Sequence, residues 1–341
     1  MSGGDKINSP ISWKGGKKLS LKHIRPRFPL SYSQYIEVFG GGGWVFFAKK
    51  PEANDVYNDF NSHLSNMFAC IKDRVMRFIK ELGFLPFAGR DDFFVLKKFL
   101  EKEEFDDEFM KEELELAEYH LPPLEAAEVK TILTEKAKRH DVKQAAAMYK
   151  VIRYSYASSC TSFSCQALDI RRFFYLIWEA SRRMANALVE NQDFERLIRH
   201  YDRETAFFYL DPPYFDAEDY AVAFPKSDHI RLRDLLLSIK GKFMLSYNDT
   251  PEIRALYEGI PGIYIYEFER LDSIAQRAEP GKMYKELLIA NYDMEECVQQ
   301  REATQLSLFD AYMEIDENDD DCESGGELYL PDGGIYHEGL P

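Results

Sequence analysis

Short apolar runs alternate with longer amphipathic stretches along most of the chain. The apolar runs have the length of strands and cover Gln34–Phe39, Asn54–Asn61, Ala206–Leu210, Lys242–Tyr247, Ile263–Phe268 and Lys285–Tyr292. Stretches between them, such as Ile230–Ile239, place apolar residues at helical spacing. Strands and helices in alternation predict an α/β fold, in which helices cover the faces of a layered sheet.

Two segments depart from this pattern. Between about Cys70 and Ala147, charged residues are interleaved with Phe, Leu and Ile, which predicts a mainly helical region. After Tyr292 the chain becomes acidic, carries Gly and Pro, and is poor in aliphatic residues. Because such a composition buries too little apolar surface to fold, we expect disorder from about residue 296.

The overall composition is that of a globular protein. Of the 341 residues, 45% are hydrophobic and 30% are charged, which excludes collagen-like, wholly disordered and disulfide-stapled classes. The five cysteines show no CxxC or Cys/His ligand spacing, so we predict a reduced intracellular compartment and no metal site. We see no signal peptide and no apolar stretch of membrane-spanning length, and therefore expect a soluble cytoplasmic protein.

Charge is unevenly distributed along the chain. The net charge is −16, but residues 291–341 hold 15 acidic residues against one Arg, and residues 101–128 hold 12 against two Lys. The remainder of the chain is therefore mildly basic. Since binding responds to local potential more than to total charge, a polyanionic partner is compatible with this sequence.

Four glycines, Gly40–Gly43, follow the first predicted strand and precede a helix-like segment. A glycine turn at this point lets the backbone approach a bound nucleoside closely. The spacing matches neither a dinucleotide fingerprint nor a P-loop, and a plain tight turn is an equal alternative. Asp59 lies near the end of the next predicted strand, where a carboxylate commonly binds ribose hydroxyls, although an ordinary Asx-turn has the same sequence.

Asp211-Pro212-Pro213-Tyr214 comes directly after the apolar run Ala206–Leu210. Two prolines donate no backbone hydrogen bonds, so the chain must leave the sheet there. A carboxylate, free carbonyls and an aromatic ring then lie at the carboxyl end of a buried strand, where open α/β sheets bind ligands.

Near the N-terminus, the segment Ser12–Lys18 places three lysines around two glycines, beside Trp13. A basic, flexible loop of this kind suits an anionic or carboxylate ligand, and a solvated terminal segment is the alternative.

Taken in this order, the motifs resemble the alpha-class adenine-N6 DNA methyltransferases, the Dam-like family. The resemblance covers about residues 1–65 and 200–292 and is carried by Trp13 with Gly15-Gly16-Lys17, Phe39-Gly40-Gly41 with Phe46-Phe47, Asn58-Asp59-Phe60-Asn61 and Asp211-Pro212-Pro213-Tyr214. One departure is Ser12, which stands where the family often has a lysine.

The resemblance implies a domain organisation. Residues 1–69 and 166–295 would form a doubly wound, Rossmann-like methyltransferase sheet. Residues 70–165 would be an inserted, mainly helical DNA-recognition region, and residues 296–341 a disordered acidic tail.

The resemblance also implies a cofactor, S-adenosylmethionine, and roles for the motif residues. Those that would contact the cofactor are Trp13, Lys17, Phe39, Gly40, Gly41, Asp59 and Asp211. In the catalytic motif, Asp211 and the Pro212 carbonyl would accept hydrogen bonds from the amine of a flipped adenine, beside Pro213. Tyr214 would stack on that base.

Double-stranded DNA is the implied partner. The stretch Tyr149–Arg172 is rich in Ser, Tyr and Arg, and its candidate phosphate-binding residues are Lys150, Arg153, Arg171 and Arg172. A hydroxyl-rich loop packed beside the core is the alternative for this stretch.

A short motif in the acidic tail, Gln305-Leu306-Ser307-Leu308-Phe309, resembles the bacterial sliding-clamp-binding peptide. In that case Gln305, Leu306, Leu308 and Phe309 would contact the clamp, because a linear anchor needs apolar side chains between solvated flanks. Docking of the same side chains on the protein's own body is the alternative.

The sequence therefore predicts a site-specific adenine-N6 DNA methyltransferase of bacterial or phage type. A cytosine-N4 or RNA methyltransferase would use similar chemistry. A catalytically silent, clamp-tethered DNA-binding protein is the alternative of another class, although a binder has no need of both Asp211 and Tyr214.

Overall fold

The computed structural model describes most of the chain. The residues described are 7–84, 89–101, 115–116, 118–123, 125–128, 141–158, 160–165, 168–215, 224–271 and 281–305. The chain divides into two compact units, Met1–Cys297 and Val298–Pro341. Residues 294–297 of the first unit and 298–305 of the second are helical, which corrects the predicted start of disorder at residue 296.

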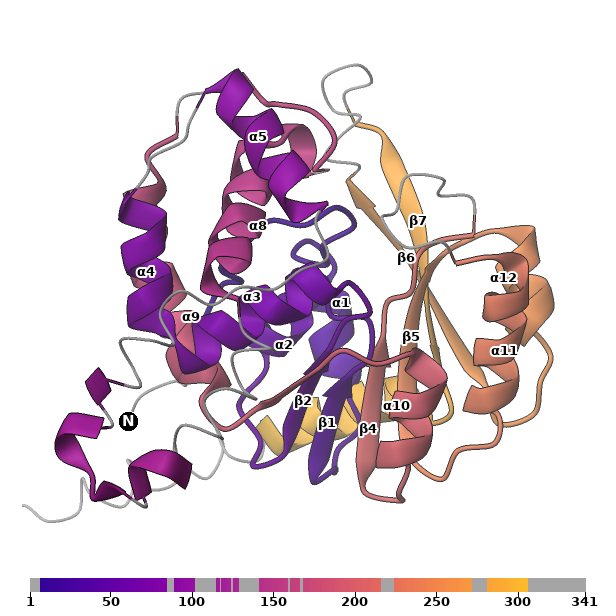
Figure 1. Cartoon of the computed structure of the whole chain (residues 1–341). Helices are drawn as coiled ribbons and strands as arrows, with labels where there is room; N and C mark the ends of the chain where they lie inside the picture. Colours follow the sequence, from indigo (N-terminus) through magenta and orange to yellow (C-terminus); the bar gives the residue numbers. More distant parts are fainter. Residues whose placement is uncertain are drawn as a thin grey trace, which may run out of the picture. The chain divides into compact units, whose positions relative to one another are not determined.

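A seven-stranded sheet lies at the centre of the first unit (Figure 1). The strands are β1 (Gln34–Glu37), β2 (Asp55–Asn58), β3 (Leu188–Glu190), β4 (Ala206–Leu210), β5 (Lys242–Asn248), β6 (Tyr264–Leu271) and β7 (Met283–Ala290). Their order is β3-β2-β1-β4-β5-β7-β6. The first five are parallel, and β7 runs antiparallel to both β5 and β6.

Helices cover both faces of the sheet, because the strand side chains alternate between two hydrophobic cores. In β4, Phe207 and Tyr209 enter the first core, whereas Phe208 and Leu210 enter the second. The helices of the first core are α1 (Leu21–Ile24), α2 (Trp44–Ala48), α3 (Ser62–Asp73), α4 (Val75–Phe84), α5 (Arg90–Leu100), α8 (Val142–Tyr154) and α9 (Phe174–Met184). Those of the second core are α10 (Phe194–Tyr201), α11 (Lys226–Leu236) and α12 (Pro251–Tyr257).

The described residues also include three short 3₁₀ segments. They are η1 (Arg25–Arg27), η2 (Tyr156–Ser158) and η3 (Ile170–Phe173). No helix among the described residues has the length and apolar character needed to cross a membrane.

The predicted α/β architecture and six of the seven strands are confirmed to within a few residues. Strand β3 was not predicted, because it is only three residues long and lies half-exposed at the sheet edge. The helices α4, α5 and α8, from the region predicted as a helical insert, pack in the same hydrophobic core as α2 and α3. This region therefore shares its core with one face of the sheet.

Candidate active site

A cavity of about 210 Å³ opens at the carboxyl ends of the parallel strands. Its lining comes from residues 38–43 after β1, 58–61 after β2, 192–194 after β3, and Asp211 and Pro213 after β4. The N-terminal residues 13–17 close one side. Strands β1 and β4 lie side by side although their connections lead to opposite parts of the sheet, so the cavity occupies the topological switch point where doubly wound folds bind ligands.

The glycine turn forms the floor of this cavity. The Gly40 N–H donates a 2.7 Å hydrogen bond to the Asn58 carbonyl, and a Cβ at Gly40 would lie 2.2 Å from the Tyr57 ring. Gly41 has φ +49°, and a Cβ there would lie 2.8 Å from the Trp13 indole. Only glycine fits these two positions, and the indole of Trp13 consequently packs directly on the turn.

Asp59 joins the ends of β1 and β2. Its Oδ2 accepts a 2.8 Å hydrogen bond from the Gly41 N–H, and its Oδ1 accepts one of 2.8 Å from the Asn61 N–H. Burial raises the pKa of this carboxyl to about 6, although the two N–H donors oppose that shift. Asp59 thus supports the glycine turn and also faces the cavity.

Asp211 pairs with Lys17 across 194 residues of sequence. The Lys17 Nζ lies 2.6 Å from Oδ1 and 2.7 Å from Oδ2, and it also donates to the Gly15 carbonyl at 3.0 Å. The Lys17 side chain is 3% exposed and that of Asp211 is 18% exposed. Burial raises the pKa of Asp211 to about 6; Lys17 opposes this shift, the nearby Glu286 carboxylate adds to it, and Arg270 opposes it.

The remainder of the Asp-Pro-Pro-Tyr motif turns away from the sheet beside this pair. Pro212 is buried and Pro213 lines the cavity. The Tyr214 hydroxyl donates a 3.1 Å hydrogen bond to Oε1 of Glu286, and Lys17 Nζ lies 4.9 Å from the centre of the Tyr214 ring. The motif is therefore in contact with both the N-terminal loop and β7.

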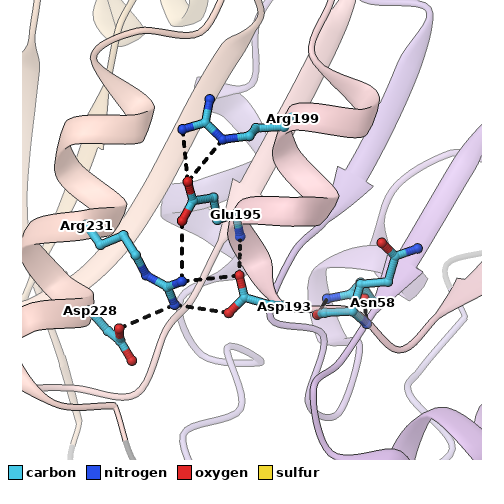
Figure 2. Close-up of polar contacts among 7 residues, drawn as sticks. Asn58, Asp193, Glu195, Arg199, Asp228 and Arg231 are labelled. Carbon is cyan, nitrogen blue, oxygen red and sulfur yellow. Dashed lines mark hydrogen bonds and ion pairs between the residues drawn. The ribbon is translucent and has the colours of Figure 1, made fainter.

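Arg231 of α11 belongs to a second charged cluster in the lining of the cavity (Figure 2). This cluster is more exposed than the Lys17–Asp211 pair, and we call it the rim cluster. The guanidinium of Arg231 lies 3.0 Å from Asp193, 3.3 Å from Glu195 and 3.3 Å from Asp228. It also lies 4.2 Å from the centre of the Phe194 ring. These contacts hold the N-terminal end of α10 against the middle of α11.

Sequence reasoning missed several residues of the cavity and its surroundings. They are Glu37, Gln192, Asp193, Phe194, Phe224, Asp228, Arg231 and, behind the motif, Glu286. Phe194 and Phe224 pack against the predicted residue Phe39, at ring-centre distances of 5.8 and 5.6 Å. A signal for Asp193 and Phe194 would have been a strand at Leu188–Glu190, since the other lining residues follow strands as well.

The four candidate phosphate-binding residues fall into two groups. Lys150 is 3% exposed inside the first core, where burial lowers its pKa. Arg153 hydrogen-bonds the Pro10 carbonyl and lies 3.8 Å from the Phe173 ring centre. Lys150 is therefore not displayed on the surface, which corrects the expectation that it is available to phosphates. Arg153 is half-buried, and its contact with phosphates stays a prediction. Arg171 and Arg172 are exposed, and Arg171 pairs with Asp169.

The clamp-binding-like motif lies mostly outside the described residues. Gln305 is the last described residue and is exposed, whereas Leu306, Leu308 and Phe309 lie beyond it. Contact with a sliding clamp stays a prediction from the sequence.

Comparison with known proteins assigns the family. The model of the D12 class N6 adenine-specific DNA methyltransferases matches residues 13–278, from Trp13 of the cavity to beyond β6. This chain belongs to that family. It is an adenine-specific, site-specific DNA methyltransferase, as the order of motifs indicated.

Individual relatives agree with this assignment. The chain is 25% identical over 301 residues to the type II methyltransferase M1.LlaDCHI of Lactococcus lactis subsp. cremoris, covering 82% of this chain and 94% of the relative. It is 24% identical over 271 residues to the type II methyltransferase M.CviBI of Paramecium bursaria Chlorella virus NC1A, covering 76% and 89%. A 62-residue segment is 34% identical to the modification methylase StsI of Streptococcus sanguinis, covering 18% and 9%.

Proposed function

We propose that this protein transfers a methyl group from S-adenosylmethionine to the N6 amine of an adenine turned out of duplex DNA, in the cavity at the ends of β1 and β4. The observation that carries this proposal is the position of Asp211. Its carboxylate, held by Lys17, faces the same cavity as the glycine turn. An acidic group for the amine and a backbone cradle for a nucleoside therefore share one space.

The donor set of the cavity fits S-adenosylmethionine, on which members of this family generally depend. The glycine turn Gly40–Gly43 lines the cavity, and Asp59 offers a carboxylate to hydroxyl or ammonium groups. The ammonium of Lys17 suits a carboxylate, while Phe39 and Trp13 supply apolar walls. When bound, the cofactor supplies an electrophilic methyl group on a positively charged sulfur.

Asp211 and the Pro212 carbonyl would act on the target amine. The lone pair of an adenine amine is delocalised into the ring, so the nitrogen is a poor nucleophile. Hydrogen bonds accepted from the amine favour a pyramidal nitrogen and stabilise its developing positive charge. With a pKa of about 6, Asp211 is mostly ionised at neutral pH and can accept those hydrogen bonds.

DNA contacts complete the proposal. Tyr214 would stack on the extruded base, and the exposed Arg171 and Arg172 would contact phosphates. A shallower dependence of DNA binding on salt in the Arg171→Gln, Arg172→Gln double variant would check the latter role. Since two relatives are named type II methyltransferases, we include modification within a restriction system in the proposal.

The experiment is transfer of labelled methyl from S-adenosylmethionine to duplex DNA, followed by nucleoside analysis. The wild type should yield N6-methyladenine, and Asp211→Asn should lose at least about 100-fold in rate, as expected when a group that stabilises developing charge is removed. Asp234→Asn, the same change at an exposed position of α11, is the matched control and should keep full activity. A wild-type protein that binds DNA but labels no adenine would overturn the proposal.

A further inference from the structure

Glu286 is a buried carboxylate in an otherwise apolar part of β7. It is 1% exposed and precedes the fully buried run Leu287–Ala290. Burying a carboxylate is costly unless hydrogen bonds and opposite charges compensate. A buried carboxylate in β7, which lies between β5 and β6 in the sheet, calls for a reason other than packing.

Three donors from different parts of the chain meet at this carboxylate. Ser20 Oγ donates to Oε2 at 2.8 Å, and Arg270 Nε of β6 donates to Oε1 at 2.7 Å. The hydroxyl of Tyr214 donates to the same Oε1 at 3.1 Å. Glu286 therefore joins the catalytic motif to the N-terminal loop and to the β6–β7 pair.

Tyr214 in turn contacts Lys17, which pairs with Asp211 in the active site. Lys17 lies 4.9 Å from the Tyr214 ring centre and 2.6 Å from Asp211 Oδ1. The ring of Tyr214 also lies 6.1 Å from that of Tyr247. The hydrogen bond to Glu286 ties the hydroxyl of Tyr214 to β7, and so it restricts the direction of the ring beside Asp211.

We propose that Glu286 is a positioning residue for methyl transfer, holding Tyr214 through its hydroxyl so that the ring receives the target base beside Asp211. This inference rests on the proposed function, since it assumes that Tyr214 and Asp211 face the base. Glu286 itself touches neither base nor cofactor in this account.

The negative charge of Glu286 also raises the pKa of Asp211, which is an effect independent of the hydrogen bond to Tyr214. The titratable groups that face Asp211 are Lys17 from the N-terminal loop, Arg270 from β6, Glu37 from β1 and Glu286 from β7. Glu286 raises the pKa of Asp211, whereas Lys17 and Arg270 lower it. Although burial by itself would raise its pKa, Lys17 and Arg270 hold the pKa of Glu286 below its ordinary value, so it is charged across the working pH range.

The test compares Glu286→Gln with Tyr214→Phe and with the double variant. Each single variant should lower kcat by about 10- to 100-fold, the cost of a small misplacement near the reacting atoms, and leave KM for S-adenosylmethionine within about threefold. The double variant should be no slower than the slower single variant, because both changes remove the same hydrogen bond. Glu267→Gln, an exposed position on β6, is the matched control and should behave as wild type.

The pH profile separates positioning from a merely structural role. In the wild type, the acidic limb of kcat/KM should lie near the pKa of Asp211, about 6. In Glu286→Gln it should move to lower pH, because a negative neighbour of Asp211 has been removed. Tyr214→Phe, which keeps that charge, should leave the limb in place.

Additive losses in the double variant, or an unchanged kcat in Tyr214→Phe, would overturn the inference while the wild type still methylates adenine. If Glu286→Gln does not fold, Tyr214→Phe alone decides the matter. A wild type without methyl transfer would contradict the proposed function, and that result is distinguishable from the others.

Discussion

Two charged clusters lie at the active-site cavity, a buried inner cluster around Lys17 and Asp211 and a more exposed rim cluster around Arg231. At the inner end, Lys17 faces Asp211, with Glu286 and Arg270 close behind. At the rim, Arg231 faces Asp193, Glu195 and Asp228 (Figure 2). The side chain of Lys17 is 3% exposed, whereas that of Arg231 is 40% exposed.

This difference in exposure determines how costly it is to remove one charged residue from each cluster. At the inner end water cannot replace a missing partner, so removal of one charge leaves another buried and uncompensated. At the rim, water and salt can take the place of any one partner. The inner cluster is therefore suited to tuning the ionisation of Asp211, and the rim cluster to holding α10 against α11.

The largest effect should come from Lys17→Met. This change leaves the carboxylate of Asp211 without its nearest cation, whereas Glu286 keeps Arg270. The free energy of unfolding at pH 7 should therefore fall by about 3–5 kcal/mol. The pKa of Asp211 should rise further above 6, since Lys17 lowers it. Methyl transfer at pH 7 should fall and recover in part at higher pH.

Denaturant unfolding measures the loss of stability, and a pH–rate profile measures the change in methyl transfer. The exposed Lys22→Met is the control. A stability loss below about 1 kcal/mol would contradict this account of the inner cluster.

An intermediate effect is expected from Glu37→Gln, at the inner end beside Asp211. Burial raises the pKa of Glu37 to about 8, although the Tyr35 hydroxyl, 2.6 Å away, opposes the shift. The unfolded chain, with an ordinary pKa of 4.5, releases this proton first as the pH rises. The wild type therefore loses stability between about pH 5 and 8, by up to about 1.4 kcal/mol for each pH unit.

Glu37→Gln should abolish this part of the pH dependence. Between pH 6 and 7.5 the variant should lose about 2 kcal/mol less stability than the wild type, measured by denaturant unfolding at each pH. The exposed Glu258→Gln should follow the wild-type profile. Parallel profiles for Glu37→Gln and wild type would show that Glu37 is already ionised in the folded protein.

The smallest effect should come from Arg231→Gln at the rim. Because its three ion pairs are part-exposed, the loss in free energy of unfolding should stay below about 1 kcal/mol. Addition of salt to about 1 M should remove most of the difference from wild type, since screening is then strong. The decrease in the free energy of unfolding of Lys17→Met should persist at the same salt concentration. A large decrease in the free energy of unfolding of Arg231→Gln that does not depend on salt would contradict the predicted difference between the two clusters.

Several elements were predictable because local rules fix them. Strand β4 begins and ends as predicted, since two prolines after Leu210 end the ladder. The glycine run after β1 forms the predicted turn, and α2 follows it as expected. The helical residues 294–297 were missed because the acidic composition around them obscured two apolar positions, Met294 and Cys297, which are buried.

Other features depended on which segments meet in space. In α8 the run Ala145–Ile152 is buried nearly all round among α3, α4 and α5, so Lys150 lies inside the core and not on a DNA-facing surface. The basic, hydroxyl-rich composition of Tyr149–Arg172 does not indicate that neighbouring helices enclose Lys150.

By itself the sequence determined the α/β alternation, the glycine turn, the strand that ends just before Asp211, and the family motifs that predict adenine methylation. These depend on backbone rules and on spacing within a few residues. Only the tertiary structure decided that Glu286 meets Tyr214, 72 residues away, and that Arg231 meets three carboxylates at the rim. Long-range packing also decided which charges lose their water, and that loss sets the pKa of Asp211.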